Sequence, residues 1–165
     1  MKLIIANILS FMPLLFFTFE FINILVKYYK KINFNNNLKY YFGLLLSPTL
    51  AQFLKYVIPY PKWMHNYTMR PEGAYDCNYF SNNGLRPSNS PAMPSGHMTT
   101  TSYFVVYNIL KYRDSVTIII SNLVLLIAMG WARIYKLCHN VIQVIFGTLL
   151  GSTISLIIYN NTIHL

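Results

Sequence analysis

Apolar and polar stretches alternate along the chain, and the apolar stretches are long. They cover residues 3–26, 40–58, 94–110, 116–134 and 139–159. The first has 24 residues, and because a helix rises 1.5 Å per residue it is long enough to cross a hydrocarbon core of about 30 Å. The pattern predicts an all-α protein, a polytopic transmembrane helix bundle of about five spanning helices. We expect residues 1–165 to form one integral membrane domain.

The first apolar stretch has a second interpretation. Lys2 followed by an apolar run is also how a secretory signal peptide begins. The run is long and no small-residue cleavage site is obvious in it, so we interpret it as a retained helix. Glu20 lies inside this run, where a carboxylate is expected near the interface or facing other helices.

The composition agrees with a membrane protein. Hydrophobic residues make up 55% of the chain and charged residues only 10%, whereas soluble domains carry roughly a quarter charged residues. The net charge of +9 suits nucleic acid, a membrane surface or a phosphorylated substrate. Because the basic residues are separated by apolar runs and form no single stripe, we discount nucleic acid.

Metal ligands are scarce in the sequence. The four acidic residues are scattered, which argues against a carboxylate-bound metal. The two cysteines, Cys77 and Cys138, form no CxxC pattern, so neither a zinc nor a haem site is indicated. We therefore expect no metal and no cofactor.

Five spans would place successive connections on alternate sides of the membrane. One side receives the basic residues Lys27, Lys30, Lys31, Lys39, Lys111 and Arg113, and the positive-inside rule makes that side cytoplasmic. The long irregular segment 59–93 and the turn near residue 135 lie on the other side, an ER lumen, periplasm or cell exterior. Cys77 and Cys138 both fall on that face, so a disulfide between them is a hypothesis.

The start of the third apolar run reads Pro94-Ser95-Gly96-His97. Pro94 suits the first helical position, because it has no N–H to leave unpaired there. The amides of Ser95, Gly96 and His97 would then face outward and form an anion site with the helix dipole. His97 would supply a titratable proton beside it. The alternative is an ordinary proline-capped helix whose histidine faces solvent.

A second group of polar residues precedes the last run. His139 and Gln143 are four residues apart, so on a helix they share a face. The Gln143 side chain would hold one imidazole nitrogen of His139 and leave the other free to attack. The same side of the membrane holds basic residues suited to phosphate, namely Lys55, Lys62, Arg70 and Arg133.

These residues resemble the motifs of the type 2 phosphatidic acid phosphatase superfamily of integral membrane lipid phosphatases. Its second motif, Pro-Ser-Gly-His, is intact at residues 94–97. Its third motif, Ser-Arg, five residues, His, three residues, Asp, matches Arg133, His139 and Gln143 with alanine and glutamine at its two ends. Glutamine at the last position also resembles the dolichyl diphosphatase branch of the family.

The first motif of that family, a lysine separated by six residues from Arg-Pro, is imperfect here. Lys62 precedes Arg70-Pro71 with seven residues between them. Lys55 is the alternative equivalent if the loop carries an insertion. The resemblance covers about residues 50–150, and typical members have six core helices where we count five.

The resemblance implies a metal-independent lipid phosphatase or diphosphatase. Lys55 or Lys62, together with Arg70, Arg133, Ser95 and Gly96, would hold the phosphate. His139 would attack phosphorus and form a phosphohistidine, and His97 would protonate the leaving oxygen. A polyprenyl or dolichyl diphosphate suits this chemistry, with a phosphatidate-type lipid as second choice.

Two other functions stay open at this point. A transporter or lipid-phosphate-binding membrane protein would use the basic pocket without turnover, but binding alone does not need the pair of histidines. A catalytically inactive relative would also carry the altered first motif and Gln143. The sequence leaves the oligomeric state open.

Overall fold

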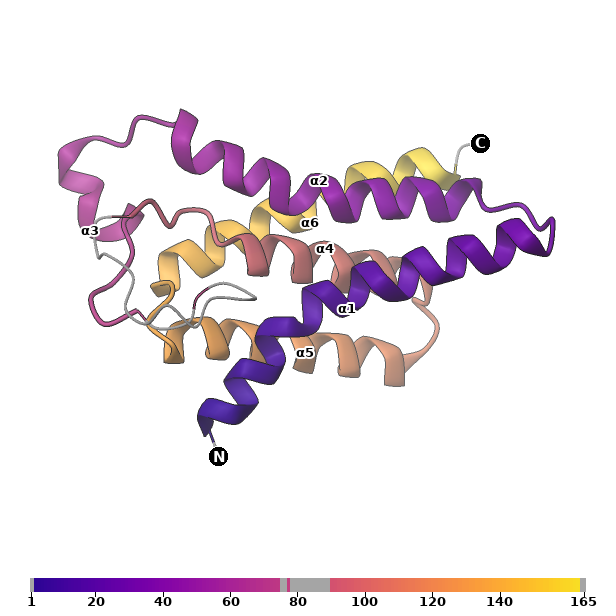
Figure 1. Cartoon of the computed structure of the whole chain (residues 1–165), viewed down its shortest axis with the longest axis horizontal. Coiled ribbons are helices and arrows are strands. Elements are labelled where there is room, and N and C mark those ends of the chain that lie inside the picture. Colours follow the sequence, from indigo (N-terminus) through magenta and orange to yellow (C-terminus); the bar gives the residue numbers. More distant parts are fainter. Residues whose placement is uncertain (1, 75–76, 78–89, 164–165) are drawn as a thin grey trace.

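The computed structural model describes residues 2–74, 77 and 90–163, so part of the 59–93 segment lies outside the described residues. Five long helices form the bundle, namely α1 (Lys2–Tyr29), α2 (Asn35–Val57), α4 (Gly96–Lys111), α5 (Val116–Tyr135) and α6 (Val141–Ile163) (Figure 1). Two short helices, η1 (Lys62–Met64) and α3 (His65–Thr68), lie between α2 and α4. The described residues contain no strand, which confirms the all-α prediction.

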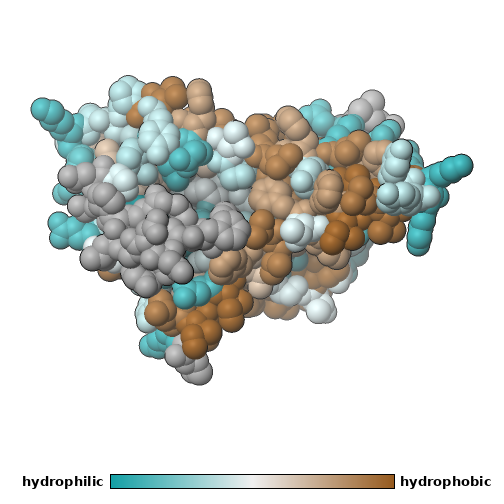
Figure 2. All heavy atoms as spheres, viewed as in Figure 1, coloured by the Kyte–Doolittle hydropathy of each residue, from teal (hydrophilic) through white to brown (hydrophobic). Residues whose placement is uncertain are grey.

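Three of the described helices, α1, α5 and α6, are long and apolar enough to cross a membrane. Figure 2 shows apolar residues gathered along the middle of the visible face, between hydrophilic residues at the two ends. Helix α2 has the length to cross but is less apolar than these three, and α4 has only 16 residues, about 24 Å. The structure is that of a membrane-compatible helix bundle, and the count of about five spans stays a prediction.

Helix α4 lies inside the bundle, in contact with α1, α2, α5 and α6. Its many hydroxyl groups are tolerated there because several bond to carbonyls of the same helix. Thr99 Oγ1 donates to Ser95 O at 2.9 Å, and Thr100 Oγ1 donates to Gly96 O at 3.1 Å.

Close packing of α4 on α6 positions the start of α4. Gly147 and Gly151 lie four residues apart on α6 and allow the two backbones to meet. A Cβ on Gly147 would lie 2.6 Å from the carbonyl oxygen of Ser95, and one on Gly151 would overlap the carbonyl of Thr99. The approach also brings the Ser95 amide to the Gln143 carbonyl, at 3.2 Å.

Two predicted helix starts are wrong by about two residues. Helix α4 begins at Gly96 with Ser95 as its N-cap in extended backbone, so Pro94 lies outside the helix. The Ser95 amide is also not free, because it donates to Gln143 O. Helix α6 begins at Val141, so His139 belongs to the preceding turn and not to a helix face shared with Gln143.

Candidate active site

A reciprocal capping arrangement at the start of α6 places His139 beside Gln143. Asn140 is the residue before the helix, and its Oδ1 accepts from the backbone N–H of Gln143 at 2.9 Å. Gln143 Oε1 in return accepts from the backbone N–H of Asn140 at 3.3 Å, which completes a capping box. The same Oε1 lies 3.1 Å from His139 Nδ1. The predicted pairing of these two side chains is therefore present, although a turn and not a helix face produces it.

The Gln143 side chain also fixes which imidazole nitrogen carries the proton. Its Nε2 donates to two backbone carbonyls, Tyr67 O at 2.9 Å and Met69 O at 2.8 Å. The opposite amide orientation would set oxygen against both carbonyls, so Oε1 must face His139. Because an amide oxygen only accepts, His139 Nδ1 carries the hydrogen. The neutral ring then has its lone pair on Nε2.

Two buried arginines flank this histidine, and each is held by a backbone carbonyl of a cysteine. Arg133 is fully buried, and its Nη2 donates to Cys77 O at 2.9 Å. Arg70 is 7% exposed, and its Nη1 donates to Cys138 O at 2.9 Å. Arg70 Nε also donates to Ser90 Oγ at 3.2 Å. These hydrogen bonds fix the position of each guanidinium.

Cys77 and Cys138 form a disulfide, with their Cα atoms 5.4 Å apart. The hypothesis of a bridge on this side of the bundle is confirmed. The bridge joins the segment before α4 to the turn that carries His139. It therefore ties together the two carbonyls that hold Arg133 and Arg70.

The second histidine lies near the same cations. His97 is 9% exposed in the first turn of α4, and the charges of Arg133, Lys55 and Lys136 act on its ring. Ser95, the residue that caps this turn, is fully buried, and its Oγ has no hydrogen-bond partner within the described residues. A buried hydroxyl in that position is available to a ligand oxygen.

Burial and positive charge hold the pKa of His139 well below its usual range. The ring is 3% exposed, so desolvation disfavours the imidazolium, and the charges of Arg133, Lys55 and Arg70 act in the same direction. The neutral ring is the nucleophilic form. His139 therefore keeps its Nε2 lone pair at neutral pH.

The two candidate lysines of the first motif lie in different surroundings. Lys55, near the end of α2, is half-buried and its charge acts on both histidines. Lys62 is exposed at the start of η1 and is not among the charges that act on either ring. The geometry thus brings together His97, His139, Arg70, Arg133, Gln143, Ser95, Gly96 and Lys55, and it leaves Lys62 outside.

Three residues of the site were not anticipated. Ser10 of α1 accepts from Arg133 Nη1 at 3.1 Å, and its backbone hydrogen-bonds His97. Lys136 is 5% exposed beside His97, and Asn140 completes the capping box. The Asn-x-x-Gln spacing was a readable signal for Asn140. Ser10 lies in an apolar run with nothing in its sequence context to distinguish it.

The arrangement joins a neutral imidazole, a second histidine and three fixed cations, which together suit an anionic phosphoryl group. Within the described ranges no three His, Cys, Asp or Glu side chains gather as metal ligands would. A family model, the PAP2 superfamily, matches residues 35–163, which is most of the chain. The chain belongs to the PAP2 superfamily.

PAP2 membership indicates a phosphatase, a hydrolase of phosphoric esters, in a membrane setting where a lipid phosphate is the plausible substrate. The matched region contains every candidate site residue named from the sequence. Helix α1, which contributes Ser10, precedes that region. No curated protein and no solved structure matches the chain significantly.

Proposed function

We propose that this PAP2 protein is a multi-pass, metal-independent phosphatase that hydrolyses a lipid phosphate or diphosphate through a phosphohistidine. The observation that supports this most is the Gln143–His139 pair, because it leaves a neutral Nε2 lone pair beside two buried arginines. A protein that only binds phosphate needs the cations but not an oriented imidazole. A polyprenyl or dolichyl diphosphate is the favoured substrate, and phosphatidate is the second candidate.

The reaction has two steps that return the enzyme to its starting state. His139 Nε2 attacks phosphorus, the bond from phosphorus to the lipid oxygen breaks, and His97 gives its proton to that oxygen. Water then attacks the phosphohistidine, and its proton passes to His97 as the phosphorus–nitrogen bond breaks. Inorganic phosphate leaves, His139 is neutral again, and Gln143 has held its Nδ1 hydrogen throughout.

The cations and the start of α4 hold the phosphoryl oxygens during both steps. Arg70, Arg133 and Lys55 supply positive charge that is already in place, so little reorganisation accompanies the transition state. Ser95 Oγ and the Gly96 amide complete the cradle. We place this site on the non-cytoplasmic face, because most of the basic connections lie at the opposite end of the bundle.

Phosphate release by the detergent-solubilised full chain in EDTA tests the proposal. The substrates are a polyprenyl diphosphate and phosphatidate, and the variants are His139→Ala and, as the matched control, exposed His65→Ala. We expect release by the wild type and the control, none by His139→Ala, and an acid-labile phosphoryl group on the wild type. Folded wild-type protein that releases phosphate from neither substrate would favour a binding protein instead.

The same assay separates the two candidate lysines. Lys55→Gln should reduce kcat/KM by about tenfold or more, since a charge-assisted contact to phosphate is lost. Lys62→Gln, at an exposed position, should leave it unchanged. The reverse result would assign the first motif to Lys62.

A further inference from the structure

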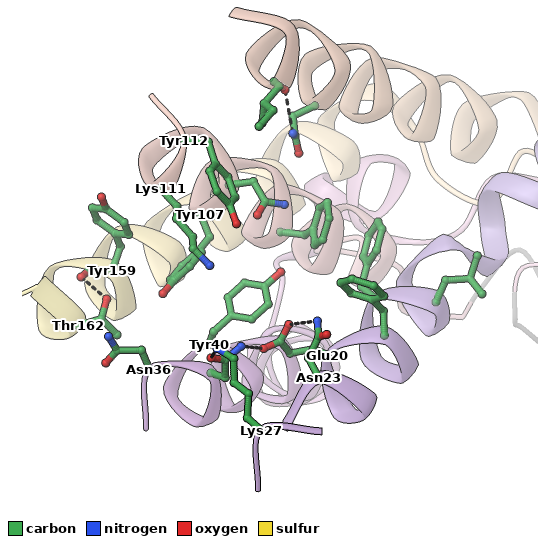
Figure 3. Close-up of a pocket in the computed structure, with 18 of the residues that line it drawn as sticks. Glu20, Asn23, Lys27, Asn36, Tyr40, Tyr107, Lys111, Tyr112, Tyr159 and Thr162 are labelled. Atoms are coloured by element: carbon green, nitrogen blue, oxygen red, sulfur yellow. Dashed lines mark hydrogen bonds between the residues drawn. The ribbon is translucent and has the colours of Figure 1, made fainter. Parts of the chain in front are cut away.

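A cavity of about 1200 Å³ lies at the end of the bundle opposite His139 (Figure 3). Helices α1, α2, α4, α5 and α6 all contribute to its wall. On α1 its lining runs from Leu15 to Lys27, and neither Ser10, the residue that contacts Arg133, nor any other residue of the candidate active site belongs to the lining. The cavity is therefore separate from the candidate active site.

The lining changes from polar to apolar along the cavity. Its polar end includes Lys27, Lys111, Asn33, Asn36, Asn37 and Asn108, at the ends of α1 and α4 and the start of α2. Its apolar end includes Phe16, Phe19 and Phe104. Phe16 and Lys27 are 11 residues apart on α1, about 16 Å, or half of a hydrocarbon core. Such a gradient matches a molecule with a polar head and an apolar chain.

The charge of the polar end favours an anionic head group. Among the described residues of the lining, Glu20 is the one carboxylate, and it accepts from Asn37 Nδ2 at 2.5 Å. Asn37 Oδ1 in turn accepts from Lys27 Nζ at 2.6 Å, so Lys27 is held at the rim by this chain of contacts (Figure 3). Lys111 packs on the Tyr112 ring, 5.2 Å from its centroid. Two lysines against one carboxylate leave one positive charge in excess.

A buried amide faces the same cavity. Asn122 is 8% exposed and belongs to the lining. Its Nδ2 donates to Ile118 O of its own helix at 2.9 Å, whereas its Oδ1 has no hydrogen-bond partner in the described part of the chain. A buried acceptor in this state is costly unless a ligand or water donates to it. The hydroxyl of a head group is a suitable donor.

We propose that this cavity binds a phosphodiester lipid, with its phosphate at Lys27 and Lys111 and one acyl chain along Phe16 and Phe19. A hydroxyl on the head group would donate to Asn122 Oδ1. The lining contains neither histidine nor arginine among the described residues, so the site retains the lipid and does not hydrolyse it. This binding is independent of the proposed phosphatase reaction.

Binding of dihexanoyl phosphatidylglycerol to the delipidated full chain, measured by isothermal titration calorimetry in detergent, tests the proposal. We expect one site, with affinity at least about tenfold lower for Lys27→Gln and for Lys111→Gln, because each loses a charge-assisted contact. Arg113→Gln is the matched control: it lies at the same end, is exposed and does not line the cavity. Wild-type affinity in both lysine variants would overturn the proposal.

Four further measurements separate the possible sources of the binding signal. Glycerol phosphate should bind far more weakly than the lipid, and dihexanoyl glycerol should also bind weakly, because each has only half of the recognised chemistry. Equal binding of either would overturn the lipid assignment. Orthovanadate, which competes for a phosphoryl site, should not displace the lipid, whereas displacement would place the lipid at His139. Ser121→Phe, which fills the cavity without removing a charge, should abolish binding.

Discussion

The two ends of the bundle differ in how their buried side-chain amides are hydrogen-bonded. At the His139 end, the Gln143 side chain makes four hydrogen bonds to residues of two segments, 67–69 and 139–140. At the other end, the Asn122 side chain makes a single bond, to a carbonyl of its own helix. Both residues lie on helices that run between the ends, and both are almost fully buried. The two residues are therefore similar in burial and differ in how many other parts of the chain their side-chain amides bind.

This contrast shows that the His139 end is held by hydrogen bonds, whereas the opposite end contains open volume. A nucleophile requires a defined direction, and Gln143 gives His139 one by tying it to α6 and to the backbone at Tyr67 and Met69. A site that receives a lipid requires volume and unused hydrogen-bonding capacity, which the opposite cavity has. Helices α1, α4 and α6 supply residues to both ends.

The largest expected effect comes from replacing the buried side-chain amide at each end, Gln143 or Asn122, by leucine. Gln143→Leu removes the hydrogen bonds that this side chain makes to two carbonyls and two N–H groups at the His139 end, so we expect unfolding free energy to fall by more than about 3 kcal/mol. Phosphatase activity should fall at least about 100-fold as the imidazole loses its orientation. Asn122→Leu removes only a bond within its helix and should change activity little.

Thermal unfolding and phosphate release, measured in parallel on both variants, check this contrast. A folded Gln143→Leu protein with wild-type activity would show that His139 does not depend on this contact. A large loss of activity in Asn122→Leu would show that the two ends are coupled.

The second effect concerns the residue that the family motif carries at this position. Gln143→Asp restores that motif and keeps an acceptor for His139 Nδ1, but it removes both N–H donors to Tyr67 O and Met69 O. A carboxylate facing two carbonyls is unfavourable, so we expect lower stability and activity reduced by about tenfold. Activity above wild type would mean that charge on the orienting group outweighs the anchoring of this segment.

The sequence was sufficient for much of the site but not for how it is assembled. Spacing within the second motif identified His97, and spacing within the third identified Arg133, His139 and Gln143, because each motif is a short stretch of chain. Two lysines, Lys55 and Lys62, remained candidates for the first motif, because an insertion between Lys55 and Arg70 cannot be located from spacing alone. The electrostatic contacts of Lys55 come from the packing of α2 on α4, which no local pattern encodes.

The helix starts were missed for a related reason. Helices α4 and α6 begin just after Ser95 and Asn140, later than the apolar runs indicate, because the Ser95 N–H donates to Gln143 O of another helix and Asn140 Oδ1 caps α6 by accepting from the Gln143 N–H. Ser10 was beyond sequence reasoning, since its role arises only where α1 crosses the end of α5 that carries Arg133. The apolar runs themselves predicted the long helices well, because burial and membrane exposure both select such residues.

The third effect tests the bridge that joins the two arginine anchors. The Cys77→Ser, Cys138→Ser double variant should lose about 4 kcal/mol of stability by the loop-entropy argument for a closure of this length. Because the carbonyls that hold Arg133 and Arg70 become less fixed, we expect kcat/KM to fall about tenfold. Reductant should lower kcat/KM of the wild type by the same factor and leave kcat/KM of the double variant unchanged. Full activity of the wild type, with both thiols shown to be alkylated, would dismiss this role.

The smallest effect is a shift in pH dependence at the His139 end. The low pKa of His139 keeps the ring neutral below its usual range, so kcat/KM should decline only as pH falls through that lowered pKa. Lys55→Gln removes one positive charge that acts on the ring, which raises the pKa of His139 and moves the acid limb of the profile to higher pH. The exposed Lys62→Gln variant is the control and should keep the wild-type midpoint, since ionisation of the substrate is common to both. An unchanged midpoint in Lys55→Gln, with kcat/KM lowered at every pH, would limit Lys55 to phosphate binding.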